Sequence, residues 1–202
     1  MTEAIPVKIL LGVTGGVAAY KAPDLVRRLR ERGAEVRVVM TAGAEQFVTP
    51  RTFQAVSGSP VRTSLWDEGA EAAMGHIELA RWADKIVIAP ASADFLARLT
   101  AGMADDLLAT LCLAAEAPLY VAPAMNRVMW SNPAVQANRG TLEERGMKIL
   151  GPDTGSQACG ETGAGRMLEP DVIADAVCGP EFAGAATDGI LAGKTELVTA
   201  GP

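Results

Sequence analysis

Short, nearly all-apolar runs alternate with amphipathic stretches along most of the chain. The apolar runs predict buried strands at residues 7–13, 35–40, 85–89, 118–122 and 147–150. Apolar residues at helical spacing predict helices at residues 18–32, 50–56, 93–99, 105–115, 133–145 and 171–177. Strands that are apolar on both faces and separated by helices are typical of a parallel sheet covered on both sides. We therefore expect an α/β fold, in which a doubly wound, Rossmann-like parallel sheet carries helices on both faces.

Two segments interrupt this alternation. Residues 151–165 contain five glycines and no apolar periodicity, so we expect a long flexible loop there, and such loops are commonly functional. Residues 179–193 are rich in Gly and Ala, which is typical of a linker. A new strand-like run then starts at Thr195. We expect a first domain over residues 1–178, a linker over 179–193 and the start of a second domain over 194–202.

Composition narrows the class of protein. The 202 residues include 18 Lys and Arg against 24 Asp and Glu, and the net charge of −6 argues against nucleic-acid or membrane-surface binding. The N-terminus lacks the pattern of a secretory signal, and no apolar run approaches the roughly 18 residues of a membrane span. Three scattered cysteines and a single histidine argue against a disulfide framework and a multi-His metal site. We expect a cytoplasmic enzyme without a metal site.

Small and hydroxyl-bearing residues follow four of the predicted strands, at residues 14–16, 41–43, 90–94 and 123–126. In an open parallel sheet, ligands bind beyond the carboxyl ends of the strands, where helix N-termini attract phosphate groups. A nucleotide-like phosphate ligand is therefore expected, although each turn alone could be an ordinary strand-to-helix connection. The first turn, GVTGG at residues 12–16, does not match Gly-x-Gly-x-x-Gly, which argues against a nicotinamide dinucleotide.

Two side chains are candidates for proton transfer. His76, the only histidine, is the readiest proton acceptor near neutral pH, but a lone histidine is more often structural. Cys159 lies in the Gly-rich segment and is the least core-like of the thiols. Cys112, within LLATLCLAA, is expected to pack in the core, and we assign no function to Cys178.

Three motifs carry a resemblance to a known family. Residues 14–21 (TGGVAAYK), 123–130 (PAMNRVMW) and 155–167 (GSQACGETGAGRM) resemble the opening motif, the Pro-x-Met-Asn-x-x-Met-Trp motif and the substrate-clamp loop of the homo-oligomeric flavin-containing cysteine decarboxylases. The likeness covers about residues 7–178. The Cys-bearing version of the loop is typical of members that act on phosphopantothenoylcysteine. Residues 193–202 are similar to the start of a phosphopantothenate–cysteine ligase, so this chain is expected to lack that second activity of the bifunctional bacterial members.

The resemblance implies a flavoprotein with bound FMN. It implies that Gly15 and Gly16 face the flavin phosphate. The other FMN contacts that it implies are Thr41, Phe47, Ser92, Ala93, Asp94, Phe95 and Ala124.

The resemblance also implies catalytic residues, substrate contacts and an assembly. His76 matches the family's active-site histidine, Asn126 the residue that grips the substrate carboxylate, and Cys159 the proton donor of the final step. The implied contacts to the small-molecule substrate are Asn126, Met129, Ala158 and Arg166. Family members form homotrimers with the flavin at a subunit boundary, and the fused bacterial members assemble as dodecamers of four trimers.

The implied chemistry follows from what the substrate lacks. Direct loss of carbon dioxide from a cysteine carboxylate would leave an unstabilised carbanion. Oxidation of the CH2–SH group to a thioaldehyde, by hydride transfer to FMN, places an electron-accepting C=S group beta to the carboxylate. Decarboxylation then gives an enethiol. Return of the hydride, with a proton from Cys159, would give 4′-phosphopantetheine for coenzyme A biosynthesis.

Three alternatives remain open at this point. An enzyme that stops at the enethiol of a peptide C-terminal cysteine needs no thiol donor, so Cys159 argues against it. A flavin prenyltransferase shares the sheet but is not expected to carry the Ala-Cys-Gly loop. A non-catalytic regulatory flavin binder is disfavoured by the presence of His76, Asn126 and Cys159.

Overall fold

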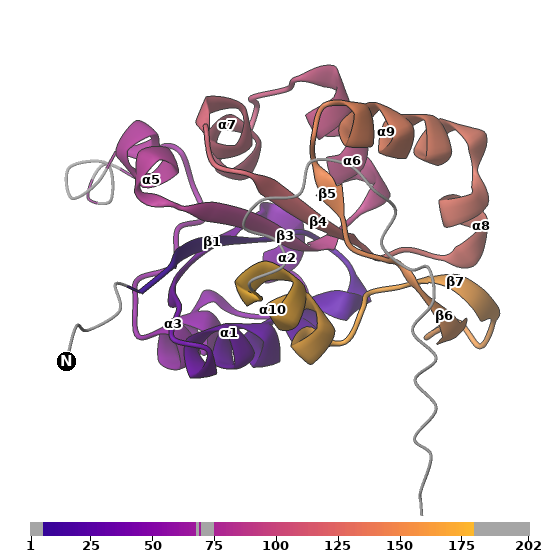
Figure 1. Cartoon of the computed structure of the whole chain (residues 1–202), viewed down its shortest axis with the longest axis horizontal. Coiled ribbons are helices and arrows are strands. Elements are labelled where there is room, and N and C mark those ends of the chain that lie inside the picture. The colour runs from indigo at the N-terminus through magenta and orange to yellow at the C-terminus, as the bar shows by residue number, and fades with distance from the viewer. Residues whose placement is uncertain (1–5, 68, 70–74, 180–202) are drawn as a thin grey trace, which may run out of the picture.

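A five-stranded parallel sheet forms the centre of the described part of the chain (Figure 1). The computed structural model describes residues 6–67, 69 and 75–179. The strands are β1 (Lys8–Val13), β2 (Glu35–Met40), β3 (Lys85–Ala91), β4 (Leu119–Pro123) and β5 (Lys148–Ile149). They lie in the order β2-β1-β3-β4-β5, each parallel to its neighbours. The predicted doubly wound parallel sheet is therefore confirmed.

Helices connect the strands, as the alternating pattern predicts. They are the 3-10 helix η1 (Val17–Lys21) and the α-helices α1 (Ala22–Glu31), α2 (Ala42–Glu45), α3 (Pro50–Ser57), α5 (His76–Trp82), α6 (Ala93–Ala101), α7 (Leu107–Ala114), α8 (Arg127–Ser131), α9 (Pro133–Glu144) and α10 (Pro170–Cys178). The helix expected over 18–32 is two elements, because Pro23 lacks an N–H and fits only the first turn of an α-helix. The short helices α2, α5 and α8 were not predicted, since so few residues show no clear apolar period.

Each face of the sheet buries its own hydrophobic core. Successive side chains of a strand point to opposite faces. Ile9 and Leu11 of β1 therefore pack with α1, α3 and α10, whereas Leu10 packs with α5, α6, α7 and α9. The two groups of helices lie below and above the sheet in Figure 1. Because both faces are covered, the strands read as continuous apolar runs, which explains why the sequence pattern locates them well.

The Gly-rich segment, expected to be a flexible loop, forms an antiparallel hairpin, so that expectation is wrong. The hairpin consists of β6 (Asp153–Ser156) and β7 (Thr162–Arg166). Gly155 lies opposite Gly163. A side chain at Gly155 would meet the Arg166 guanidinium, and one at Gly163 would meet the Arg127 side chain. Apolar alternation cannot reveal such strands, because they rest on glycines packed against arginine side chains and not on a buried apolar face.

The base of the hairpin is joined to the turn that follows β4. The Met125 N–H donates to the Gly165 carbonyl at 2.9 Å. Gly165 has a φ of +140°, and a side chain there would collide with the Met125 carbonyl, so this junction requires glycine. At the tip, the Gln157 N–H donates to the Glu161 carbonyl at 2.8 Å and closes the turn around Cys159. The hairpin thus has a fixed base and a short, tight tip.

The strand order creates one position where the chain diverges to opposite faces of the sheet. β1 continues into η1 and α1 on one face, and its neighbour β3 continues into α6 on the other. The carboxyl ends of β1 and β3 therefore form a topological switch point. In open α/β sheets, ligands bind in the crevice at such a point, and flavodoxin, whose sheet has this strand order, holds FMN there.

The described residues bear on two further expectations. Within these ranges, no helix combines the length and the apolar character that crossing a membrane requires. Of the predicted linker at 179–193, only Gly179 is described, and the predicted start of a second domain at 194–202 lies outside the described residues. The division of the chain into domains therefore stays a prediction.

Candidate active site

The buried hydroxyl of Thr14 forms hydrogen bonds between the turns that follow β1 and β3. The Thr14 side chain is 2% exposed. Its Oγ1 donates to the Pro90 carbonyl at 2.8 Å and accepts from the Ser92 N–H at 2.9 Å. Both hydrogen-bonding roles of this hydroxyl are filled, as burial of a polar group requires. The turns after β1 and β3 are thereby held side by side.

The turn after β1 is tightly packed at one glycine and open at the next. A Cβ at Gly15 would lie 2.9 Å from the Gly43 carbonyl carbon, so this turn packs directly on the backbone after β2. A Cβ at Gly16 would meet no atom within 4 Å. Nearby, helix α6 is capped by Ser92, whose Oγ accepts from the Phe95 N–H at 3.2 Å. A glycine turn beside a capped helix start is an arrangement that suits an anionic group such as a phosphate.

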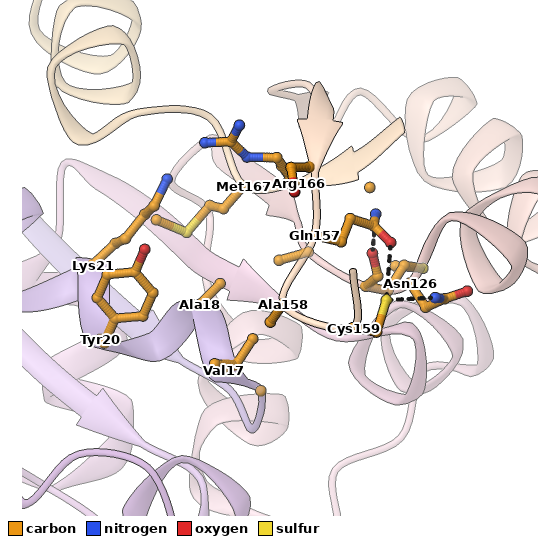
Figure 2. A pocket seen from close by; sticks show the side chains of 15 residues that line it. Val17, Ala18, Tyr20, Lys21, Asn126, Gln157, Ala158, Cys159, Arg166 and Met167 are labelled. Atoms are coloured by element: carbon orange, nitrogen blue, oxygen red, sulfur yellow. Dashed lines mark hydrogen bonds between the residues drawn. The ribbon is translucent and has the colours of Figure 1, made fainter. Parts of the chain in front are cut away.

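A cavity of about 600 Å³ opens beside this turn, within the usual size range of small-molecule sites. Its walls come from three segments that are distant in sequence: residues 16–21, the turn after β4 and the β6–β7 hairpin (Figure 2). The residues singled out by the sequence that line it are Gly16, Ala124, Asn126, Ala158, Cys159 and Arg166. The fold therefore brings all three sequence motifs to one cavity.

The tip of the hairpin brings Cys159 to Asn126. The Cys159 Sγ lies 3.4 Å from Asn126 Nδ2, a contact drawn as a dashed line in Figure 2. The same amide donates to the Glu161 carboxylate at 2.7 Å. Asn126 is oriented by its other end, since Oδ1 caps α8 and accepts from the Val128 N–H at 2.8 Å. The cap turns the NH2 group of Asn126 toward the hairpin tip.

Glu161 is held as a carboxylate at this position. The hydrogen bond from Asn126 lowers the pKa of Glu161 below its ordinary value of 4.5, and the Arg127 guanidinium, 3.2 Å away, adds to this effect. Gln157 anchors the tip from the other side. Its Oε1 accepts from the Arg127 N–H at 3.0 Å, and its Nε2 donates to the Met125 carbonyl at 3.3 Å. These side-chain contacts position the hairpin tip over Asn126.

Other residues implied to contact FMN or substrate do not line this cavity. Thr41 caps α2, with its hydroxyl accepting from the Ala44 N–H at 3.3 Å. Phe47, which follows α2, is 53% exposed, and Met129 on α8 is 48% exposed. Phe47 and Met129 thus present apolar surface to the outside of the described chain.

The side chains of the turn after β3 have contacts of their own. The Asp94 carboxylate pairs with Arg98 at 2.9 Å, one turn further along α6. The Phe95 side chain is 2% exposed and belongs to the core between the sheet and its helices. Ser92 and Ala93 are partly exposed at the start of the helix. A ligand at this turn would therefore meet Ser92, Ala93 and the backbone, and not the Phe95 ring.

His76 lies apart from this cavity. It is the first residue of α5, and α5 lies at the opposite end of the molecule from the β6–β7 hairpin (Figure 1). One copy of the described chain therefore does not bring His76 together with Asn126 and Cys159.

Sequence reasoning missed several residues of the site. Gln157 and Glu161 flank Cys159 two residues away on either side, and their polarity within a Gly-rich segment was the available signal. Lys21 ends the first motif and lines the cavity with a side chain that is only 13% exposed. A lysine at the end of a short helix is ordinarily solvated, so its burial could not be read from the sequence.

The remaining thiols lie elsewhere. Cys112 is buried among α7 and its neighbours, as expected, and burial raises the pKa of its thiol to about 12. Cys178 is half-buried on α10, and burial raises the pKa of this thiol as well. Among the residues that the structure describes, no group of three or more His, Cys, Asp or Glu side chains is placed to hold a metal ion.

Comparison with known proteins identifies the family. The family model described as Flavoprotein matches residues 2–180. The chain belongs to the flavoprotein family. This match spans every element of the fold and all three motifs that line the cavity.

The flavoprotein is similar to part of longer bacterial proteins. The "Coenzyme A biosynthesis bifunctional protein CoaBC" of Vibrio vulnificus (strain YJ016) is 58% identical over 195 residues, which cover 96% of this chain and 47% of that protein. The protein of the same name from Escherichia coli (strain K12) is 61% identical over 168 residues, which cover 83% of this chain and 41% of that protein. The chain thus spans about half the length of the curated relatives it matches.

Solved structures resemble the flavoprotein in both sequence and fold. A PPC decarboxylase mutant complexed with pantothenoylaminoethenethiol is 36% identical, with a TM-score of 0.77, over 86% of this chain and 97% of that chain. The FMN-dependent cysteine decarboxylase SpaF is 38% identical, with a TM-score of 0.71, over 85% of this chain and 97% of that chain. The family resemblance predicted from the three motifs is therefore confirmed.

Proposed function

We propose that this flavoprotein binds FMN and decarboxylates 4′-phosphopantothenoylcysteine to 4′-phosphopantetheine, a step of coenzyme A biosynthesis. The observation that carries the proposal is the contact of 3.4 Å between Cys159 Sγ and Asn126 Nδ2 at the wall of one cavity. It joins an amide able to bind a carboxylate to a thiol able to donate a proton. Similarity to CoaBC proteins, to a PPC decarboxylase and to an FMN-dependent cysteine decarboxylase supports the same assignment.

The switch point fits the phosphate and ribityl chain of FMN. The close packing of Gly15 on Gly43 and the open space beside Gly16 leave a turn that an anionic group can approach closely. Gly15 and Gly16 would hold the phosphate, and Thr41, Ser92, Ala93 and Ala124 would contact the rest of the cofactor. When bound, FMN supplies the chemistry that side chains lack, acceptance of a hydride from the substrate and its later return.

Asn126 and Cys159 would act at the cysteine end of the substrate. The Asn126 amide, oriented by its cap on α8, would donate to the substrate carboxylate and hold it until carbon dioxide leaves. The Cys159 thiol would then donate a proton to the carbon next to the sulfur-bearing one. A positioned acid of this kind typically contributes about 10²–10⁴-fold to the rate. The hairpin that carries Cys159 would also keep water away from the reactive enethiol intermediate.

The position of His76 supports a site shared between subunits. His76 lies on α5, away from the cavity that holds Asn126 and Cys159 (Figure 1). In a homotrimer with FMN at each subunit boundary, a histidine from one protomer would reach the cofactor of its neighbour. Exposed apolar side chains such as Phe47 and Met129 are suited to such a boundary. We further propose that the homotrimers assemble to a dodecamer. We also propose that a ligase domain follows the linker and that the protein is cytoplasmic.

An absorption spectrum and a product analysis test the proposed function. The purified chain should show the absorption of an oxidised flavin. With 4′-phosphopantothenoylcysteine it should release carbon dioxide and form a saturated thiol with the mass of 4′-phosphopantetheine. A colourless protein that binds no FMN, or a flavoprotein that releases no carbon dioxide, would overturn the proposal. An enethiol as the final product would instead favour an enzyme that only oxidises and decarboxylates.

A further inference from the structure

The side chain of Gln157 forms hydrogen bonds on both sides of Asn126. Its Nε2 donates to the Met125 carbonyl at 3.3 Å, and its Oε1 accepts from the Arg127 N–H at 3.0 Å. Met125 and Arg127 are the residues immediately before and after Asn126. One side-chain amide therefore holds the backbone on either side of the residue that is proposed to bind the substrate carboxylate.

The hairpin leaves room for this amide. A Cβ at Gly165 would lie 2.6 Å from Gln157 Nε2, so the glycine makes space for the Gln157 side chain. The backbone of Gly165 already accepts from the Met125 N–H at 2.9 Å. A glutamine amide carries the same donor and acceptor groups as a peptide unit. It thus adds two hydrogen bonds of the backbone type beyond the one that joins the base of the hairpin to the turn after β4.

Gln157 is also the first residue of the tip that carries Cys159. Its N–H donates to the Glu161 carbonyl at 2.8 Å, and its carbonyl accepts from the Gly160 N–H at 2.9 Å. The Cys159 Sγ lies 3.9 Å from Gln157 Oε1, and Figure 2 shows the Gln157 side chain beside Cys159 and Asn126. Cys159 itself is exposed, so core packing does not hold its thiol in place. The position of the thiol therefore depends on hydrogen bonds such as those of Gln157.

Substrate binding makes the contacts of Gln157 more important. Glu161 also links the tip to Asn126, but under the proposed function the substrate carboxylate would displace it from that amide. The remaining ion pair between Glu161 and Arg127 is exposed on both sides, and such pairs contribute little. Gln157 bonds only to backbone groups of Met125 and Arg127, which the substrate carboxylate does not need. Its two hydrogen bonds are therefore kept when the substrate is bound.

We infer that Gln157 is a positioning residue that keeps the Cys159 thiol over the substrate for the reductive half of the reaction, an inference that rests on the proposed function. In that half, the carbon that lost carbon dioxide takes the proton of the Cys159 thiol. The neighbouring sulfur-bearing carbon takes back the hydride from reduced FMN. The proton released as FMN is reoxidised returns Cys159 to its thiol form, and the product thiolate takes a proton from solvent. Gln157 touches none of the reacting atoms and acts only through the tip.

A single turnover without oxygen tests this role. The FMN-loaded Gln157→Met variant, mixed with one equivalent of 4′-phosphopantothenoylcysteine, should release carbon dioxide at a rate within about twofold of wild type. Formation of 4′-phosphopantetheine should slow about tenfold or more, because two hydrogen bonds are lost, and reduced flavin should accumulate. Rapid quenching with mass spectrometry measures both products, and flavin absorbance measures the reduced cofactor. Equal slowing of both products, or of neither, would overturn the inference.

The matched control is Gln136→Met on α9. Gln136 is also partly buried, and its amide also donates to a backbone carbonyl, that of Trp130, but it lies outside the cavity. Its loss should leave the two rates in their wild-type ratio. A slowed reductive half in Gln136→Met as well would show that the effect is not particular to Gln157 and would overturn the inference.

Hydrogen exchange separates this inference from the proposed function. If the wild-type chain releases no carbon dioxide, the proposed function fails, and the anchoring of the tip can still be measured. Arg127 begins α8, so its N–H has no partner within that helix. In Gln157→Met its amide should exchange about tenfold or more faster, while the Met125 amide, bonded to Gly165, should exchange at the wild-type rate. Unchanged exchange at Arg127, or equally faster exchange at Met125, would overturn the anchoring role of Gln157.

Discussion

The side-chain amide of Asn126 donates a 2.7 Å hydrogen bond to the carboxylate of Glu161, which lies 35 residues further along the chain. The proposed function gives the same amide to the carboxylate of the substrate. Glu161 therefore occupies, in the described chain, the hydrogen bond that the substrate would need. The Asn126 amide has two N–H donors, and it also contacts Cys159 Sγ at 3.4 Å. Under the proposed function, the substrate carboxylate would therefore compete with Glu161 for the remaining donor and displace it.

Substitution of Glu161 tests this competition. We expect Glu161→Gln to lower the KM for 4′-phosphopantothenoylcysteine about two- to tenfold with little change in kcat, because a neutral amide competes less well than a charge-assisted bond. Since the pKa of Glu161 is lowered, its carboxylate stays charged throughout the neutral range, and the bond is lost only as pH falls through that lowered pKa. The change in KM should therefore not depend on pH near neutrality. Steady-state assays of carbon dioxide release measure both effects.

The control for this substitution is Glu143→Gln on α9, which removes an exposed carboxylate paired with Arg139. It should leave KM unchanged. An unchanged or raised KM in Glu161→Gln would show that Glu161 does not compete with the substrate.

The proposed proton donor can be tested by product analysis. In Cys159→Ser, carbon dioxide should still form, but the reductive half of the reaction should stall, because a hydroxyl is a much weaker acid than a thiol. Mass spectrometry should detect the enethiol, and the flavin should remain reduced. Cys178→Ser, which changes a half-buried thiol on α10, should form the saturated product. If Cys159→Ser returned the flavin to its oxidised form together with the saturated thiol, Cys159 would not be the donor.

Alkylation should distinguish the three thiols of the folded chain. Cys159 is exposed, whereas Cys112 is buried with a pKa raised to about 12, so at neutral pH Cys112 is protonated as well as inaccessible. Iodoacetamide should modify Cys159 first, the half-buried Cys178 more slowly, and Cys112 only after unfolding. Peptide mass mapping over time measures this order. Early labelling of Cys112 would contradict the packing of α7 against the sheet.

The close contact between Gly15 and Gly43 predicts that a methyl group added at Gly15 lowers both stability and flavin content. Gly15→Ala would place a Cβ 2.9 Å from the Gly43 carbonyl carbon, so one backbone segment must shift. We expect a loss of about 1–3 kcal/mol in the free energy of unfolding and a lower flavin content. Gly140→Ala in α9 meets no atom within 4 Å and should instead gain about 0.5–1 kcal/mol. Urea unfolding and flavin absorbance measure the two quantities, and full flavin content in Gly15→Ala would contradict the expected geometry.

The sequence predicted the fold best at the strands that are buried on both faces, because each of them is a continuous apolar run. Ile86, Val87 and Ile88 of β3 alternate between the two cores, and such a run can only be a buried strand in this context. The turns at the ends of these strands could also be predicted as a ligand edge, because parallel strands present their carboxyl ends on one side.

The rest depended on contacts that leave no periodic pattern. The hairpin is built from glycines that accommodate Arg127 and Arg166, and the pairing of Lys21 with Glu169 joins residues 148 positions apart. The buried position of Phe95 shows that the direction of a side chain could not be predicted either. A residue next to a ligand-binding turn can direct its side chain into the core, and the order of residues alone does not state which way it points.

The two ends of the β6–β7 hairpin differ in how well they accept substitutions, because only the base is joined to the turn after β4 through Gly165 and Met125. At the base, a backbone hydrogen bond and a glycine with no room for a side chain make substitution costly. At the tip, Ala158 and Cys159 are exposed, whereas Gly160, with a φ of +84°, still favours glycine. Exchange of Ala158 or Cys159 at the tip would therefore change the groups that face Asn126 while leaving the sheet, the turn after β1 and the base of the hairpin intact. Enzymes that finish the same first steps with different products could diverge by this route without rebuilding their scaffold.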